Sequence, residues 1–215
     1  LAAANIAALM GLRIKFVDVN KDTFCMDLEN LKKKITKNTK AVVTINTYGN
    51  MYELRKISNF LKKKKIIFIE DSAESFGSKL NNKHSGTFGD IGTFSFHATK
   101  NLTTGEGGLV ITNNKKFAKK IELYRSHGVL NKRYFHLVHG HNFRLTNFQA
   151  ALGFAQLLKI NYIIKIRKKI YKKYLSEIKK INKKIIIQKI GNNCNFVPWT
   201  FALVVDKKFK VNRDK

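Results

Sequence analysis

The sequence predicts an α/β fold with a mostly parallel sheet flanked by helices, followed by part of a small α+β domain. Short apolar runs alternate with segments whose apolar residues recur at helical spacing, which is typical of βαβ units. The run 66–70 is almost continuously apolar, as expected of a strand covered on both faces. Two late strand-like runs indicate a separate antiparallel unit. We therefore expect a larger domain at 1–158, and a connecting helix with a partial smaller domain at 159–215.

The first half of the chain should supply the start of the sheet. Residues 1–10 have the composition of the end of a helix, which Gly11 would close. Asp27 is placed to cap a short helix. Apolar residues at helical spacing and runs of β-branched residues mark the other elements. We expect helices at 1–10, 27–34 and 52–64, and strands at 13–19, 41–47 and 66–70.

The second half begins with two short strands on either side of a glycine-rich turn. A helix follows, then a loop rich in histidine, glycine and asparagine, and then a long helical stretch with one apolar face. Gly153, inside that stretch, indicates close packing against a neighbour. We expect strands at 92–96, 108–112, 185–189 and 196–205, helices at 113–126 and 146–180, and a loop at 127–144.

The charge of the chain is strongly positive, +28 at pH 7. A nucleic-acid or acidic-membrane partner is one explanation. Lysine far outnumbers arginine, however, and no arginine stripe interleaved with aromatic residues accompanies the basic runs. We therefore interpret the charge as a lysine-rich surface and expect neither nucleic acid nor membrane as the main partner. Such a surface would still attract an anionic small substrate.

The location of the protein is expected to be cytoplasmic. No apolar stretch reaches the ~18 residues of a membrane span, and no basic segment precedes the apolar residues 1–10, so they do not resemble a secretory signal. Cys25 and Cys194 form neither a metal motif nor a disulfide framework. The chain lacks an initiating methionine, and we expect it to be a fragment truncated at both ends.

The most informative residue is Lys100. It follows the strand-like run that contains Ser95 and precedes a turn with three glycines at 105, 107 and 108. A lysine in this setting can form a Schiff base with a carbonyl, although a lysine is more often simply exposed to solvent. Asp71 follows another apolar strand, at the edge of the sheet where α/β proteins bind ligands. An aspartate there can keep a pyridine nitrogen protonated, as pyridoxal phosphate chemistry requires, or it can cap a helix.

The neighbours of these residues sharpen the hypothesis. Glu70 should point to the opposite face of its strand from Asp71, which makes it the weaker partner for a ring nitrogen. Ser95 can donate to a phosphate or bond within the backbone. His136, His139 and His141 match no metal-binding spacing, so we expect no metal site.

These residues resemble the nucleotide-sugar aminotransferases of the DegT/DnrJ type, a branch of the fold-type I pyridoxal phosphate enzymes that includes perosamine synthases. The resemblance extends in register over nearly the whole chain, which is more specific than any single motif. The matching stretches are 16–19, 39–43, 48–49, 70–74, 86–92, 95–108, 125–128, 140–146, 149–153 and 156–157.

The resemblance implies a role for each site residue. Lys100 would bind the cofactor covalently and later carry the proton between the substrate carbon and the cofactor. Asp71 would pair with the ring nitrogen, and Ser95 would bind the phosphate. Asn142 would reach the cofactor of the neighbouring subunit, which implies an obligate homodimer with shared active sites. Arg144 is a weaker assignment, near the substrate or structural.

Glu74 occupies the position where many relatives carry glutamine or histidine against the 3-hydroxyl of the cofactor. Some members that aminate 4-keto-6-deoxy sugars also have glutamate at this position, so the resemblance favours amination at C4. Related sugar 3-dehydratases replace the Schiff-base lysine with histidine, so Lys100 favours transamination. The phosphate-binding loop and the aromatic residue that stacks on the cofactor are expected before residue 1, so the fragment alone is expected to be inactive.

The resemblance thus implies an aminotransferase that moves an amino group from L-glutamate to a nucleotide-linked 4-keto-6-deoxy sugar, for cell-surface polysaccharide such as lipopolysaccharide or for amino-sugar biosynthesis. Two alternatives remain open. One is an inactive fragment or basic binding module on the same fold. The other is a pyridoxal phosphate-dependent dehydratase of the same family.

Overall fold

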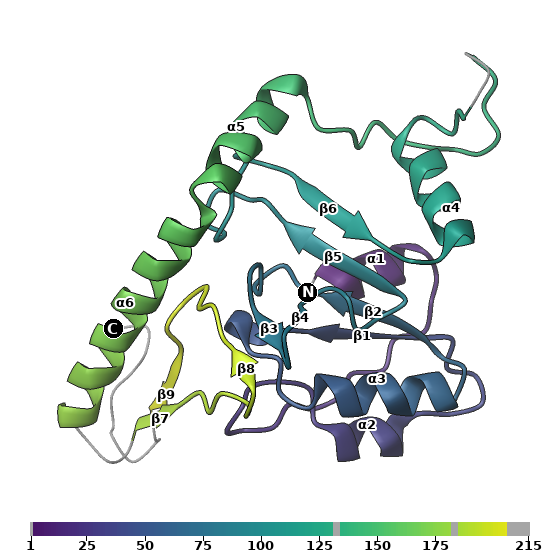
Figure 1. Cartoon of the computed structure of the whole chain (residues 1–215). Coiled ribbons are helices and arrows are strands. Elements are labelled where there is room, and N and C mark those ends of the chain that lie inside the picture. The colour runs from purple at the N-terminus through teal and green to yellow at the C-terminus, as the bar shows by residue number, and fades with distance from the viewer. Residues whose placement is uncertain (1, 131–133, 182–184, 206–215) are drawn as a thin grey trace.

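The fold is organised around a four-stranded sheet in the order β1-β2-β5-β6. The computed structural model describes residues 2–130, 134–181 and 185–205. The first three strands run parallel and the fourth is antiparallel to its neighbour, so the predicted mostly parallel sheet is confirmed (Figure 1). The strands are β1 (Ala41–Ile45), β2 (Ile67–Asp71), β5 (Ile91–Ser95) and β6 (Gly108–Ile111).

The core lies between this sheet and two helices, α2 (Leu28–Lys34) and α3 (Leu54–Lys63). Leu31, Ile57 and Leu61 are almost fully buried there beside Phe68 of β2. Burial of each such side chain contributes roughly 1.5–3 kcal/mol. Asp27 caps α2 by accepting a hydrogen bond from the backbone N–H of Asn30 at 2.7 Å, as its position in the sequence predicted.

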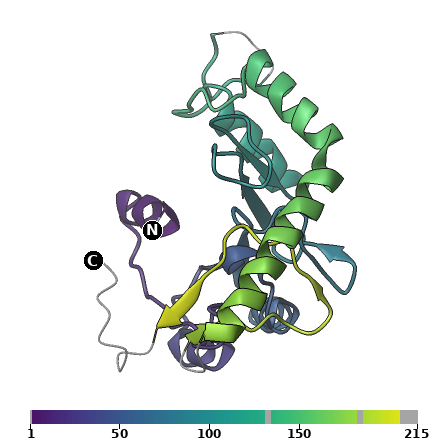
Figure 2. The same cartoon turned by 90° about the vertical axis from the view of Figure 1, so that its left-hand side faces the viewer.

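The remaining helices also lie close to their expected positions. The capping box of Thr146 and Gln149 begins the long helical stretch, and Lys159 divides that stretch into two helices. A Cβ on Gly153 would approach Thr104 to 2.8 Å, which confirms the predicted close packing. The two helices of this stretch, α5 (Asn147–Leu158) and α6 (Ile160–Ile181), form one long diagonal across the molecule (Figure 1). Helix α1 (Ala2–Leu9) stands apart from the body in Figure 2. The remaining helix is α4 (Lys115–Arg125).

The strand expected at 13–19 is wrong. Within the described residues, this segment has no strand beside it, and its ladder contact is a single antiparallel bridge between Val19 and Met26. An apolar run with strand character forms a strand only when a neighbour satisfies its backbone hydrogen bonds. The segment consequently runs as an irregular connection to α2.

The C-terminal segment is antiparallel, as predicted, but it also joins the larger unit. Strands β7 (Ile185–Ile187) and β9 (Leu203–Val205) pair with each other. Between them, β8 (Cys194–Asn195) pairs with β3 (Lys79–Leu80), which in turn pairs with β4 (Lys83–His84). The division at residue 158 therefore stays a prediction, because the segment after it adds a strand to a sheet formed by residues before it.

A buried carboxylate joins the end of β2 to the loop before β5. Glu70 is fully buried and accepts four hydrogen bonds, from the side chains of Asn46 (2.8 Å) and Ser72 (3.2 Å) and from the backbone N–H groups of Gly86 (2.6 Å) and Phe88 (2.8 Å). Four donors replace the water that the carboxylate loses on burial. Glu70 thus holds the loop at 85–88 against the sheet.

Replacing Glu70 with glutamine should destabilise the protein by about 2–3 kcal/mol. The amide places an N–H₂ group where an oxygen now accepts, so at least one buried backbone donor loses its partner. Denaturant unfolding would measure the change. The matched control is Glu177→Gln on α6, whose carboxylate forms an exposed pair with Lys180 and should change stability by less than about 0.5 kcal/mol. Equal effects of the two substitutions would contradict the role given to Glu70.

Candidate active site

The candidate site lies at the edge of the sheet where the parallel strands end. Asp71 is the last residue of β2 and pairs in register with Ile45 of β1 and Thr93 of β5. Ser95 is the last residue of β5, and Lys100 follows it in the loop that leads to β6. Carboxyl ends of parallel strands share one edge, so Asp71 lies at the same edge as the segment that contains Ser95 and Lys100.

Asp71 presents one free carboxylate oxygen. Its Oδ1 accepts a hydrogen bond from the backbone N–H of Ala73 at 3.0 Å, which fixes the orientation of the carboxylate. Among the described residues, nothing donates to Oδ2. Glu70 is turned the other way into its buried network, as the alternation along a strand predicted. Of the two neighbouring carboxylates, Asp71 is therefore the one available to a ligand.

Glu74 interacts electrostatically with both Asp71 and Lys100. Its Oε2 accepts from the backbone N–H of Tyr48 at 2.7 Å. Burial raises the pKa of the Glu74 carboxyl, and the negative charge of Asp71 raises it further, whereas the Tyr48 N–H and the positive charge of Lys100 lower it. Glu74 thus lies within electrostatic range of both residues, and the structure brings Asp71, Glu74 and Lys100 together.

Lys100 is half-buried and held from two directions. Its backbone N–H donates to the carbonyl of His97 at 3.0 Å. Its Nζ lies 3.7 Å from the ring centroid of Trp199, over the indole face. The exposed Lys83 also lies over a ring, that of Phe88 at 4.7 Å, so it is the partial burial of Lys100 together with its closer contact that distinguishes it from the exposed lysines.

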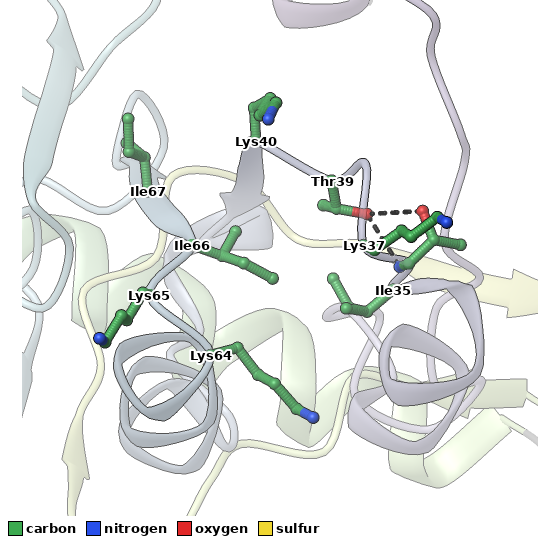
Figure 3. A pocket seen from close by; sticks show the side chains of 9 residues that line it. Ile35, Lys37, Thr39, Lys40, Lys64, Lys65, Ile66 and Ile67 are labelled. Atoms are coloured by element: carbon green, nitrogen blue, oxygen red, sulfur yellow. Dashed lines mark hydrogen bonds between the residues drawn. The ribbon is translucent and has the colours of Figure 1, made fainter.

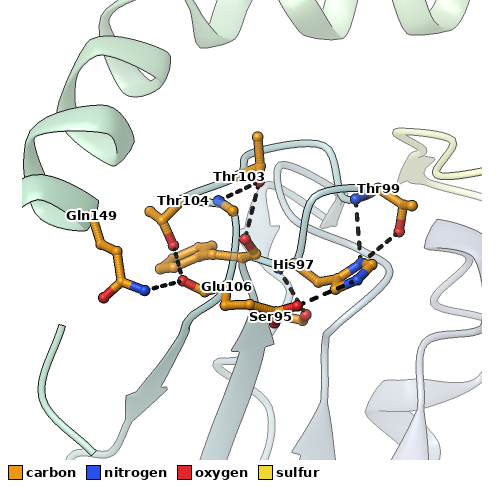
Figure 4. Close-up of polar contacts among 9 residues, drawn as sticks. Ser95, His97, Thr99, Thr103, Thr104, Glu106 and Gln149 are labelled. Atoms are coloured by element: carbon orange, nitrogen blue, oxygen red, sulfur yellow. Dashed lines mark hydrogen bonds and ion pairs between the residues drawn. The ribbon is translucent and has the colours of Figure 1, made fainter. Parts of the chain in front are cut away.

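The loop between Ser95 and β6 is stiffened by its own polar side chains (Figure 4). Ser95 Oγ accepts from the backbone N–H of His97 at 3.3 Å, which leaves its hydroxyl hydrogen free to donate. Thr104 donates to the carbonyl of Glu106 at 2.7 Å, and Gln149 of α5 donates to the same carbonyl at 3.1 Å. The loop that carries Lys100 is thereby tied to the sheet and to α5.

Three residues of the site were not predicted from the sequence: Tyr48, Arg167 and Trp199. Tyr48 lies just after β1 with a left-handed backbone, φ 58°, a conformation that is rare outside glycine and concentrated at functional sites. Trp199 is the one tryptophan of the chain, and its adjacency to the single proline was the one available signal. Arg167 lies among many basic residues of α6, and nothing in the sequence distinguishes it.

Asn142 and Arg144 lie elsewhere, on the exposed segment between α4 and α5. Arg144 donates to the Asn142 side chain at 3.2 Å. Within the described part of the chain, neither residue contacts Asp71, Glu74 or Lys100. Their expected roles at a neighbouring subunit stay predictions.

A hollow of about 600 Å³ lies at the opposite edge of the sheet (Figure 3). It is formed where β1 and β2 begin, and its basic lining residues are Lys37, Lys40, Lys64 and Lys65. No carboxylate, histidine or cysteine is among its lining residues, so it offers positive charge but no acid–base pair. It contributes to the basic surface and is separate from the Lys100 site.

Other reactive groups do not form a competing site. Burial raises the pKa of the Cys25 thiol to about 12, so the thiolate form is scarce near neutral pH. The described residues contain no group of three or more histidine, cysteine, aspartate or glutamate side chains placed to hold a metal ion. Nor do they include a helix that is long and apolar enough to cross a membrane.

Comparison with known proteins identifies the family. The DegT/DnrJ/EryC1/StrS aminotransferase family profile matches residues 1–215. The chain is 34% identical to GDP-perosamine synthase of Vibrio cholerae over 214 residues, which cover 99% of this chain and 58% of the relative. It is 32% identical over 187 residues to GDP-4-keto-6-deoxy-D-mannose 3-dehydratase of Escherichia coli O55:H7, covering 79% of this chain and 48% of that one.

A solved structure agrees with the sequence matches. Helicobacter pylori PseC, described as an aminotransferase involved in the biosynthesis of pseudoaminic acid, superimposes with a TM-score of 0.89 and 33% identity, covering 97% of this chain and 56% of PseC. The chain thus spans about half the length of these relatives, from 48% to 58%. The match over all residues and the shared fold both lead to one conclusion: the chain belongs to the DegT/DnrJ/EryC1/StrS aminotransferase family.

Proposed function

We propose that the protein is a pyridoxal phosphate-dependent aminotransferase that moves an amino group from L-glutamate to a nucleotide-linked 4-keto-6-deoxy sugar. The observation that carries the proposal is the half-buried amine of Lys100, gathered with Asp71 and Glu74 at the ligand-binding edge of the sheet. The names of the relatives, GDP-perosamine synthase and an aminotransferase of pseudoaminic acid biosynthesis, support the sugar as acceptor.

The donor set fits the cofactor. Asp71 Oδ2, which receives no hydrogen bond from the described residues, can hold a proton on a pyridine nitrogen. The Ser95 hydroxyl hydrogen can donate to a phosphate, and the Lys100 amine can condense with an aldehyde. Pyridoxal phosphate, when bound, supplies an electron sink. Lys100 then acts as the group that takes and returns the proton at the reacting carbon.

Glu74 is placed to make a hydrogen bond with the cofactor. Burial raises the pKa of its carboxyl from the ordinary glutamate value. The 3-hydroxyl of the cofactor can donate to this carboxyl. This agrees with the resemblance, which associates glutamate here with amination at C4 of the sugar.

The active unit in this proposal is a homodimer with shared sites. Asn142 and Arg144 are exposed and remote from Lys100 within their own chain. Phe143, between them, is 71% exposed, and Phe148 on α5 is 84% exposed. Large exposed aromatic side chains are typical of surfaces that a partner covers. A second copy contacting this surface would let Asn142 reach the neighbouring site. In this proposal the enzyme is cytoplasmic and serves the biosynthesis of cell-surface polysaccharide.

Two other functions remain as alternatives. A dehydratase is supported by the match to GDP-4-keto-6-deoxy-D-mannose 3-dehydratase, but the lysine at position 100 favours transamination, since histidine is expected there in the dehydratases. A basic binding module is supported by the charge of +28. Tight, sequence-tolerant DNA binding at moderate salt, without amination, would favour that module.

Replacing Lys100 with alanine should abolish amination, with a loss of roughly 10²–10⁴-fold or more, because the variant lacks both the covalent link and the proton carrier. The assay uses the full-length protein, since the fragment alone is expected to be inactive, and incubates it with L-glutamate and a panel of nucleotide-linked keto sugars; products are identified by mass spectrometry and NMR. Lys165→Ala, an exposed lysine on α6, is the control and should keep full activity. Full activity of the Lys100 variant would overturn the assignment, and a dehydrated, unaminated product would favour the dehydratase.

Replacing Glu74 with glutamine should change how stability depends on pH. The raised pKa means that ionisation of Glu74 disfavours the folded state. The free energy of unfolding of the native protein therefore falls as the pH rises from the pKa of Glu74 in the unfolded chain towards its higher pKa in the folded protein. The variant lacks this loss. Urea unfolding at pH 4, 5, 6 and 7 should therefore show the stability of the variant rising relative to the native protein with increasing pH. A constant difference between the two would contradict the raised pKa.

A further inference from the structure

Trp199 is the aromatic partner of the site lysine. The Lys100 ammonium lies over its indole face, 3.7 Å from the ring centroid. The indole Nε1–H donates to the carbonyl of Thr99, the residue before the lysine, at 2.9 Å. One side chain from the C-terminal segment therefore contacts both the backbone and the side chain of the segment that carries the amine.

The indole is held in place from the side of the sheet as well. Its ring stacks on Tyr48 with centroids 6.3 Å apart and an interplanar angle of 27°. The backbone N–H of Trp199 donates to the carbonyl of Tyr48 at 3.3 Å. Phe24 packs edge-on against the Tyr48 ring, with ring centroids 6.5 Å apart and an interplanar angle of 89°. The backbone N–H of Tyr48 also donates to the Glu74 carboxylate, so the residue that stacks on Trp199 contacts Glu74 as well.

Arg167 of α6 joins the same two segments at the backbone. Its Nη1 donates to the carbonyl of Trp199 at 2.9 Å, and its Nη2 donates to the carbonyl of Lys100 at 3.4 Å. The fork of a guanidinium group suits two acceptors at a set separation. The position of the indole relative to the lysine is thus fixed by side-chain and backbone contacts, and not by the cation–π contact alone.

This arrangement suits a lysine whose amine must be free for part of a reaction cycle. A lysine ammonium on its four-carbon stem has many rotamers, and a released amine would otherwise move into solvent. An indole face attracts the ammonium but accepts no proton from it. A carboxylate in the same place would compete for the proton that the lysine has to deliver.

We propose that Trp199 is a positioning residue that holds the free, protonated amine of Lys100 beside the site between the steps in which that amine is bonded. The use of the amine rests on the proposed function, whereas the contact itself can be tested without cofactor or sugar. A protein that proved unable to aminate sugars would therefore refute the proposed function and still leave the contact open to measurement.

The first test uses the fluorescence of the native tryptophan. Because the chain contains one tryptophan, its emission reports on the surroundings of this ring alone. Lys100→Met removes the charge and keeps a long side chain, so the emission intensity or maximum should change. Lys165→Met, on the exposed side of α6, should leave the spectrum unchanged. Identical spectra for the native protein and both variants would overturn the contact.

The second test measures the reactivity of the amine. Acetic anhydride acetylates free amines, and peptide mass spectrometry gives the rate at Lys100 relative to Lys165. Trp199→Leu should raise that relative rate about twofold to tenfold, the range that a lost cation–π contact supplies. Trp199→Phe, which keeps an aromatic face but loses the bond to Thr99, should stay within about twofold of the native protein.

The control for this series is Tyr162→Leu, which removes an aromatic ring that is 67% exposed on α6. Circular dichroism would verify that each variant is folded. If Trp199→Leu does not fold, the fluorescence test still applies, because it uses the Lys100→Met and Lys165→Met variants. In the amination assay on the full-length protein, Trp199→Leu should lower kcat while the KM for L-glutamate stays within about twofold, because the residue acts on the lysine and not on the substrate. An unchanged acetylation rate at Lys100 in folded Trp199→Leu would overturn the proposal.

Discussion

The alternation of side chains at the end of β2 determines the arrangement of the site. Glu70 points into the protein, where four hydrogen bonds hold it in place of water. The next residue, Asp71, must then point to the opposite face, where one of its oxygens is free. A buried carboxylate with a complete set of donors tolerates little movement. The same contacts that fix the loop at 85–88 therefore also fix the direction of the Asp71 carboxylate.

The C-terminal segment forms part of this arrangement. Val197 is almost fully buried, and its backbone N–H donates to the Ser78 hydroxyl at 3.0 Å. Gln188 donates to the carbonyls of Thr23 and Thr47, on either side of the first strand. These contacts place the residues that follow, including Trp199, against the Lys100 loop. A segment that could be considered a separate small domain thereby supplies one wall of the site.

The electrostatic character of the molecule differs between its surface and its site. Among the residues that the structure describes, most lysine and arginine side chains are exposed, and a hollow lined by lysines lies at the edge of the sheet away from Lys100. At the site, two carboxylates and one amine lie close together, so the local balance is not basic. The overall charge can attract an anionic nucleotide to the protein, but the chemistry depends on the small group of residues where the strands end.

The sequence by itself determined the elements whose signals are local, and the family. Helix caps such as Asp27, the helical spacing of α3 and the apolar run of β2 depend on neighbours along the chain, so the elements were predicted close to their observed bounds. Lys100, Asp71, Glu74 and Ser95 were singled out through their positions after strands and through the resemblance. Only the tertiary structure decided that residues 13–19 are not a strand, because a strand requires a partner that is distant in sequence. Packing of the chain likewise brings Arg167 and Trp199 to the Lys100 segment and Tyr48 to Trp199. Contacts between residues so distant in sequence leave no periodic pattern in it.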